Sequence, residues 1–303
     1  MICVLHWLLT MSDDKRILAL DSQILDAIQK CPFYTYLNFM KNYRPNEIIQ
    51  PMQRGDLGHT MLETYYKLLQ KGYEWNEAVE KATEVGREHY QSLSLDLQTS
   101  EWIVKTFHQY TKYYQFDGIK ILGVEDSFSF VVYEDEELII VYEGKIDLTA
   151  EFPILGKSIV DHKWRQQKAD YIGLDNQLIG YAVKEDVNLV YINEVGLQRS
   201  YEPEKKFRRV AIPIGDGVKE RWLKNTIMWA KILDHNIQSN VWPQSHLKTP
   251  PVGLTQCAKC IYNKICNSEN DEEMTRKIQE HFHIGPKWSA HRQESEVNGE
   301  VLT

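Results

Sequence analysis

The stretch of this chain that most constrains its fold is residues 142–181. Two apolar runs within it each end at an acidic residue, the first at Asp147 and the second at Asp161. The segment between them, residues 153–157, carries the Pro and Gly that are typical of a hairpin turn, so we expect two neighbouring strands. Residues two apart project from the same face of a strand, so Asp161 and Lys163 should point the same way, with Asp147 brought beside them by strand pairing. Two carboxylates and an ammonium in this arrangement suit a divalent metal ion that activates water against a phosphodiester.

The chain has 303 residues, and 43% of them are apolar, including eight Trp and seventeen Tyr. This composition can build a core and excludes a disordered protein, while the length permits one large domain or a domain with an appended part. The formal net charge of −8 argues against a general basic coat for duplex DNA, although a local basic groove is compatible with it. Two runs of cations could form such a groove or could equally be exposed side chains on strand ends. They are Lys163, Arg165 and Lys168, and Lys205, Lys206, Arg208 and Arg209.

The two termini differ in character from the rest of the chain. Residues 2–10 are apolar but too short to cross a membrane, and they lack both a basic region and a cleavage site. We therefore expect residues 1–16 to be an N-terminal extension of a cytoplasmic protein (in the host cytoplasm if phage-encoded), without a membrane partner or a disulfide framework. Residues 267–303 form a polar tail, of which 289–303 have the composition of a disordered segment.

Hydrophobic periodicity predicts the remaining elements. A helix capped by Asp21 or Ser22 should be interrupted at Cys31, and Gly55 and Gly58 should precede a helix that ends at Gly72. Further helices are predicted within 75–116 and at 217–239, and strands at 121–133, 137–148, 187–197 and 210–214. Helices placed between strands of one sheet predict an α/β core.

Glu125, in the first of these strands, has two interpretations. The pattern favours an exposed strand residue, and the alternative is a carboxylate that supports a metal site.

Gln177 and Tyr181 follow the two acids at i, i+4 spacing, which places them on one face of a helix. The order acid, acid-x-Lys, Gln-x-x-x-Tyr resembles the PD-(D/E)XK nuclease superfamily, in particular its RecB-like branch. His59 alone would be a helix cap or a surface residue, yet its G-x-x-x-H pattern upstream of the acids is similar to the same branch. The resemblance implies a mixed central sheet flanked by helices, with a helical insertion at about 59–116 and a catalytic core at about 117–240.

The resemblance also implies roles for individual residues. His59, Asp147, Asp161 and the backbone carbonyl of His162 would hold Mg²⁺ or Mn²⁺, and an imidazole among carboxylates favours Mn²⁺. Lys163 would orient the attacking water or stabilise the transition state, and Gln177 and Tyr181 would position the scissile phosphate. The chain departs from the family at Asp161-His162-Lys163-Trp164, where Tyr and Thr are usual around the lysine. Trp164 could stack on a base, but we favour a place in the core.

Four of the five cysteines form a set. Cys257, Cys260 and Cys266 are close in sequence and Cys31 lies far upstream, followed by Pro-Phe-Tyr. Four thiolates can hold one metal centre, and a zinc ribbon would normally show two local pairs. This pattern resembles the iron–sulfur nucleases, such as AddB and the CRISPR-adaptation nucleases, in which a 4Fe–4S cluster joins the N-terminal helix to the C-terminal segment. Zinc and ordinary core cysteines are the alternatives, and Cys3 is left unassigned.

Together these features predict one nuclease domain over residues 17–266, with a cluster segment at 257–266. The expected activity is metal-dependent cleavage of DNA at single-stranded ends, with a helicase or recombination protein as a partner, since no P-loop motif occurs in the chain. A CRISPR-adaptation trimming nuclease is the near alternative. A non-catalytic nucleic-acid-binding or assembly subunit that kept the fold is the alternative of another class.

Overall fold

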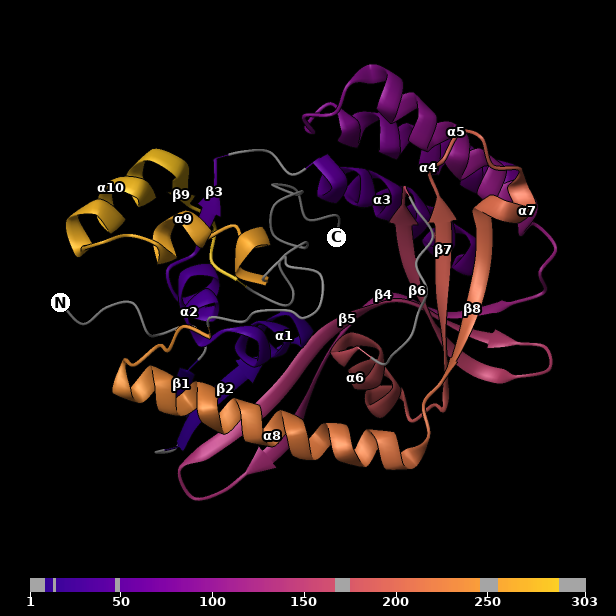
Figure 1. The fold of residues 1–303 in the computed structure, drawn as a ribbon. Coiled ribbons are helices and arrows are strands. Elements are labelled where there is room, and N and C mark those ends of the chain that lie inside the picture. Colours follow the sequence, from indigo (N-terminus) through magenta and orange to yellow (C-terminus); the bar gives the residue numbers. More distant parts are fainter. Residues whose placement is uncertain (1–8, 13–14, 47–49, 167–174, 246–255, 289–303) are drawn as a thin grey trace. The chain divides into compact units, whose positions relative to one another are not determined.

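The computed structural model describes residues 9–12, 15–46, 50–166, 175–245 and 256–288 (Figure 1). They fall into two compact units, each assembled from separate stretches of the chain. The first unit comprises residues 1–47, 129–144 and 220–303, and the second comprises residues 48–128 and 145–219. Two long strands, β4 (Lys120–Glu134) and β5 (Leu138–Phe152), contribute residues to both units.

The second unit is built on a mixed sheet. The end of β5 pairs antiparallel with β6 (Gly156–Arg165), β6 runs parallel to β7 (Leu189–Gly196), and β7 is antiparallel to β8 (Phe207–Pro213). A tight turn between Phe152 and Gly156 joins β5 to β6, so the predicted hairpin is confirmed. The parallel β6–β7 pair requires a crossover, which contains α6 (Asn176–Glu185).

Helices cover both faces of this sheet, which confirms the predicted α/β fold with a mixed central sheet. Val160 and Trp164 of β6 join a buried cluster with residues of three helices: α3 (Gln50–Gln70), α4 (Trp75–Tyr90) and α5 (Leu97–Tyr113). Lys163 of the same strand instead hydrogen-bonds to α6. Alternate residues of β6 therefore face opposite layers, as the pleat requires. A short helix, α7 (Pro203–Lys206), leads into β8.

Helix α3 begins earlier than its sequence pattern predicts, because Gly55 and Gly58 lie inside it rather than before it. A Cβ atom on Gly58 would lie 2.2 Å from the ring of Trp164, so only glycine lets α3 approach β6 this closely. Gly58, which the sequence pattern predicts to precede the helix, is therefore needed inside it for close packing against Trp164. His59, which follows it, lies in the body of the helix.

Strand β4 contains a backbone irregularity at Glu125, whose φ is 55°. This left-handed conformation is unfavourable for a residue with a Cβ and changes the direction in which the strand projects its side chains. Such strain persists only where surrounding structure holds it, and it is often found at functional sites.

The first unit contains β1 (Leu9–Ser12), which is antiparallel to β2 (Lys15–Leu20), and β2 runs parallel to the start of β5. Helix α1 (Ser22–Lys30) follows β2, and the Asp21 carboxylate caps it by accepting a hydrogen bond of 2.8 Å from the Ile24 amide, as predicted. Most of α8 (Asp216–Ser239) also belongs to this unit. The rings of Tyr142 in β5 and Trp222 in α8 meet edge to face with centroids 4.9 Å apart.

The same unit joins segments from opposite ends of the chain. The upstream elements are α2 (Pro32–Thr35), the π-helical turn η1 (Tyr36–Met40) and β3 (Tyr43–Pro45). The downstream elements are η2 (Gln256–Lys259), α9 (Asn263–Cys266), α10 (Asp271–His281) and β9 (Phe282–Ile284). Strand β3 pairs with β9, and Leu37 shares a buried cluster with Tyr262, Ile265 and Phe282.

The structure shows regular elements in parts of both terminal segments. Part of the expected N-terminal extension, residues 9–12 and 15–16, is in paired strands, and part of the expected polar tail forms α10 and β9. Strand pairing to the rest of the unit, which local composition does not reveal, orders these segments. Cys3 and residues 289–303 lie outside the described residues. Within the described chain, no helix has both the length and the apolar character needed to cross a bilayer.

Candidate active site

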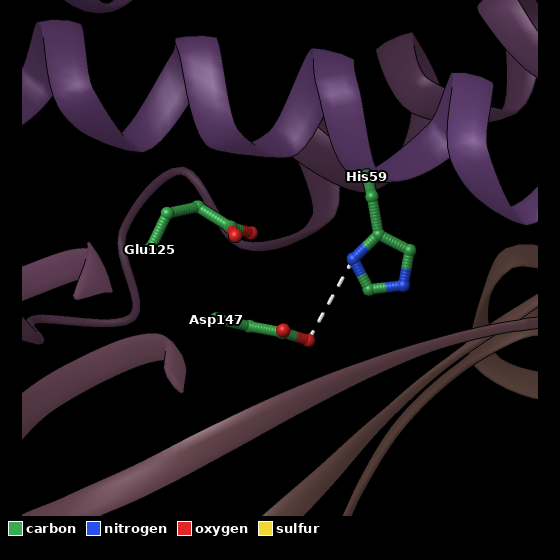
Figure 2. A group of neighbouring side chains, drawn as sticks. All are labelled: His59, Glu125 and Asp147. Carbon is green, nitrogen blue, oxygen red and sulfur yellow. Dashed lines mark ion pairs between the residues drawn. The ribbon is translucent and has the colours of Figure 1, made fainter. Parts of the chain in front are cut away.

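Three side chains of the second unit form a group of potential metal ligands. His59 comes from α3, Glu125 from β4 and Asp147 from β5, and one ligand atom from each lies within 4.8 Å of the others. Figure 2 shows the imidazole and the two carboxylates turned toward one another, with His59 Nδ1 at 3.6 Å from an Asp147 carboxylate oxygen. Imidazole and carboxylate donors together suit Mn²⁺, and carboxylates and water also suit Mg²⁺.

The sheet itself places Asp147. The β5–β6 ladder ends at the pair Leu148 and Val160, so Asp147 and Asp161 come directly after it. Asp147 Oδ2 accepts a hydrogen bond of 2.7 Å from the backbone amide of His162. This bond satisfies an amide where regular pairing stops, and it fixes the carboxylate at the end of the ladder.

A second set of polar side chains continues from Asp161. Lys163 Nζ lies 2.9 Å from Asp161 Oδ2 and donates to Gln177 Oε1 at 3.1 Å. The Gln177 amide donates to the Tyr181 hydroxyl at 2.8 Å, and that hydroxyl donates to the backbone carbonyl of Lys145 at 2.5 Å. The predicted placement of Asp161 and Lys163 on one strand face, and of Gln177 and Tyr181 on one helix face, is therefore observed.

The predicted metal ligands are brought together only in part. His59 and Asp147 belong to the three-residue group, whereas the Asp161 carboxylate is held by Lys163. Asp161 is fully buried and close enough for its charge to add to the burial that raises the pKa of Asp147. The role of the His162 carbonyl stays a prediction; its imidazole faces the other side of β6, where it stacks on Tyr66 at a centroid distance of 5.5 Å.

Glu125 is the site residue whose exposure the sequence pattern predicted incorrectly. Only 8% of its side chain is exposed, so the expectation of an exposed strand residue is wrong. The left-handed backbone at Glu125 turns the carboxylate inward, where it is paired with Lys145 at 3.1 Å. Regular strand alternation could not have signalled this, because the irregularity breaks the alternation itself.

Burial dominates the electrostatics of the group. It raises the pKa of Glu125 to about 7, and the charge of Asp147 adds to the effect. Burial and the charge of Asp161 likewise raise the pKa of Asp147 to about 7. Burial lowers the pKa of His59, which favours the neutral imidazole that a metal ion requires. A bound metal ion would remove the penalty for ionising both of these buried carboxylates.

Lys163 behaves differently. Burial by itself lowers the pKa of its ammonium, but the Asp161 charge, the hydrogen bond to Asp161 and the Asp147 charge outweigh burial, so the net pKa is raised. In the metal-free protein the side chain is therefore held as a cation.

The raised carboxyl pKa values predict how stability depends on pH. In the metal-free protein the folded state holds protons on Glu125 and Asp147 up to about pH 7, whereas the unfolded chain releases them near pH 4. Folding is therefore favoured by these groups at low pH, and their contribution is lost as pH rises through 7. In the presence of a chelator, we expect thermal melting to fall by several degrees between pH 5.5 and 8.

The matched measurement is the same pH series for Glu125→Gln. The glutamine cannot ionise, so its melting temperature should fall less across this range. Added Mn²⁺ should restore the wild-type protein most at pH 8. Equal pH slopes for the two proteins would contradict the assignment of a buried, proton-holding Glu125.

The run at residues 205–209 is largely engaged within the unit. Lys206 is only 3% exposed and its ammonium lies over the Trp102 ring at 4.4 Å from the centroid. Arg209 is paired with Asp117 at 2.7 Å, and Arg208 is paired with Glu194. Three cations of this run therefore have partners within the unit, and a basic DNA groove at this run stays a prediction. Lys168 of the other run lies outside the described residues.

Trp164 is a core residue, as the sequence analysis favoured. It is 8% exposed and belongs to the buried cluster under α3. Its ring contacts the position of Gly58, one residue before His59. The unusual tryptophan after the D-x-K triplet therefore sets the distance between α3 and β6.

In the first unit, the four grouped cysteines line one cavity of about 70 Å³. All four carry free thiols: Cys31, Cys257, Cys260 and Cys266. Burial, together with the charges of Cys260, Cys31 and Cys257, raises the pKa of Cys266 to about 11. Among the described residues, however, their sulfur atoms do not form a group as tight as that of His59, Glu125 and Asp147.

Comparison with known protein families finds a match over most of the chain. The family model of the PD-(D/E)XK nuclease superfamily matches residues 23–267. No curated protein matches the sequence significantly.

Solved structures with a similar arrangement include two of low sequence identity. One is a candidate exonuclease from Eubacterium rectale, which is 12% identical, with a TM-score of 0.44 over 83% of this chain and 94% of that one. Another is the protein SSO0001, which is 8% identical, with a TM-score of 0.35 over 86% of this chain and 89% of that one. The match of the family model covers both the His59 group and the Asp161–Lys163 pair, and on it we conclude that the chain belongs to the PD-(D/E)XK nuclease superfamily.

Proposed function

We propose that the protein is a metal-dependent deoxyribonuclease that acts as an exonuclease on single-stranded ends. The observation that carries this proposal is the convergence of His59, Glu125 and Asp147 beside the buried Asp161–Lys163 pair. A purely nucleic-acid-binding or assembly subunit would not need to bury three carboxylates at one place, because isolated buried charge is costly. A bound divalent cation would offset the cost of burying these carboxylates, and the same cation would serve in phosphodiester hydrolysis.

The residues fit Mg²⁺ or Mn²⁺ by donor chemistry. His59, Glu125 and Asp147 would hold the ion, and Asp161 and the His162 carbonyl, as the family pattern implies, would complete the site. When bound, such an ion lowers the pKa of water and offsets charge on the phosphate. Lys163, held as a cation by Asp161, would stabilise the negative charge that develops at phosphorus. Gln177 and Tyr181 fix the position of the ammonium through the hydrogen bonds described above.

Lys163→Ala is expected to keep metal binding and to lose most turnover. Its ammonium acts on the transition state, so we expect kcat to fall by about 10²–10³-fold, the usual cost of removing one such donor. Calorimetry should give an Mn²⁺ affinity equal to or higher than that of the wild type, since Asp161 loses a competing cation. Lys157→Ala, on the same hairpin but paired with Glu185 at 2.7 Å, is the matched control. A parallel loss of Mn²⁺ affinity would show that Lys163 has another role.

We further propose that Cys31, Cys257, Cys260 and Cys266 hold a structural 4Fe–4S cluster. The shared cavity supports a common metal centre. Zinc is the weaker alternative, because a zinc ribbon normally shows two local cysteine pairs, whereas Cys31 lies far upstream of the other three. Bound iron would also relieve the mutual repulsion that raises the Cys266 pKa.

The decisive assay uses end-labelled single-stranded and double-stranded DNA, with and without Mn²⁺. Mononucleotide release from the ends of single strands would support the proposal, and absence of metal-dependent cleavage on any DNA or RNA would favour the assembly-subunit alternative. Trimming of overhangs to a fixed length would instead favour the CRISPR-adaptation nuclease. A cytoplasmic location and a helicase or recombination partner stay predictions from the sequence.

A further inference from the structure

The second unit contains another cavity, of about 430 Å³, that the metal site does not use. Its lining is rich in aromatic side chains from α3, α4 and the segment after α5, among them Tyr65, Trp75, Tyr114 and Phe116, and β4 contributes Ile121. Aromatic rings are planar and present both faces and edges for contact, so a pocket lined in this way suits a flat ring system. The volume is ample for a single nucleobase.

Among the residues that line this cavity, Phe116 is notable for its high exposure to solvent. Its residue is 90% exposed, in a turn that follows α5. A fully exposed phenylalanine contributes nothing to the core, and here it stands at a cavity whose other rings are largely buried. An exposed aromatic side chain beside a preformed pocket is what a stacking site for single-stranded nucleic acid provides.

The charge of the pocket favours a base over a phosphate. Its one acidic lining residue, Asp117, is neutralised by Arg209 at 2.7 Å, and the Arg209 guanidinium lies 4.0 Å from the centroid of the Tyr114 ring. No lysine or arginine lines the cavity among the described residues. Gln115, also in the lining, has an amide that can donate to and accept from the edge of a base.

Two elements, α3 and β4, contribute residues both to this pocket and to the candidate active site. On α3, Tyr65 follows His59 by six residues, which corresponds to about 9 Å along the helix. On β4, Ile121 precedes Glu125 by four residues, or about 13 Å along the strand. These separations match about three to four stacked nucleotides at roughly 3.4 Å each.

We propose that this aromatic pocket binds one nucleobase of the substrate strand, about three to four nucleotides from the bond that is cleaved. The proposal rests on the proposed nuclease function and deepens it, because it assigns the unpaired base as a recognised part of the substrate. A base can reach such a pocket only when it is not paired in a duplex, so the pocket would select single-stranded DNA.

The test is a binding experiment with single-base resolution. Fluorescence anisotropy is measured with labelled oligothymidylate in Ca²⁺, and with a series of the same oligonucleotide in which one abasic position is moved stepwise from the end. Phe116→Ala should weaken binding of the intact oligonucleotide about tenfold, the loss expected for one base–aromatic stack. One abasic position should weaken wild-type binding to a similar extent and should have no further effect on Phe116→Ala.

Ile154→Ala is the matched control, because Ile154 is a 94% exposed apolar residue in the β5–β6 turn of the same unit. Its binding should equal that of the wild type. Unchanged DNA binding by Phe116→Ala, or strictly additive losses for the variant and the abasic site, would overturn the proposal that the pocket binds a base. The proposed nuclease function would still stand if the wild-type protein cleaves DNA. A wild-type protein that neither binds nor cleaves DNA would overturn both. If Phe116→Ala binds DNA normally but binds a partner protein less well, the pocket holds a side chain of that partner and not a nucleobase.

Discussion

Asp161→Ala is expected to abolish DNA cleavage while the protein still folds. Asp161 is fully buried at the end of the β5–β6 ladder, and its carboxylate lies 2.9 Å from Lys163 Nζ. Removing it takes away a charge from the candidate metal site and releases the ammonium from its fixed position. Because two functions are lost together, we expect a fall in rate of at least about a thousandfold, beyond the roughly 10²–10³-fold cost of a single lost donor.

The measurement is the initial rate of cleavage over a range of Mn²⁺ concentrations, with circular dichroism as the check on folding. Asp161→Asn is the companion variant, since it keeps the volume and should show the same loss without a cavity. Glu151→Ala removes an exposed carboxylate from the end of β5 and should leave cleavage unchanged. Full Mn²⁺-dependent activity of Asp161→Asn would remove Asp161 from the active site.

Cys31→Ser is the second change with a large expected effect, on colour and stability. Protein purified without oxygen is expected to be brown, with absorption near roughly 400 nm and about four irons per chain, and the variant should be colourless. Cys31 and Cys257 are 226 positions apart (257 − 31), so a shared cluster closes most of the chain into one loop. Cluster binding contributes directly to folding free energy, and a long closed loop adds an entropic term that grows only slowly with length. We therefore expect thermal melting of Cys31→Ser to fall by ten degrees or more, on the order of a lost structural metal.

Cys3→Ser supplies the control, because Cys3 is the one cysteine outside the predicted set. It should keep colour, iron content and melting temperature. If wild-type protein prepared without oxygen is colourless and contains one zinc ion, the metal that joins the two segments is zinc and not an iron–sulfur cluster. A Cys31→Ser variant with full colour and stability would show that Cys31 is not a ligand.

The sequence by itself determined the β5–β6 hairpin of the candidate active site and the helix that follows it. Period-two alternation ending at Asp161 and Lys163, a Pro- and Gly-containing turn, and the i, i+4 pair Gln177 and Tyr181 are local patterns, and local patterns survive in the fold wherever the backbone stays regular. The order of these residues along the chain was also enough to suggest the superfamily that the family model shows.

Only the tertiary structure decided the parts that depend on close approach or on irregular backbone. Glu125 reads as an exposed strand residue, but a left-handed φ of 55° buries it beside Asp147. Gly58 reads as a helix breaker, but the ring of Trp164, more than a hundred positions later, requires a residue without a Cβ there. Arg209 reads as part of a basic surface, but Asp117 neutralises it. In each case the deciding partner is distant in sequence, so no local pattern contains it, and only packing brings the two together.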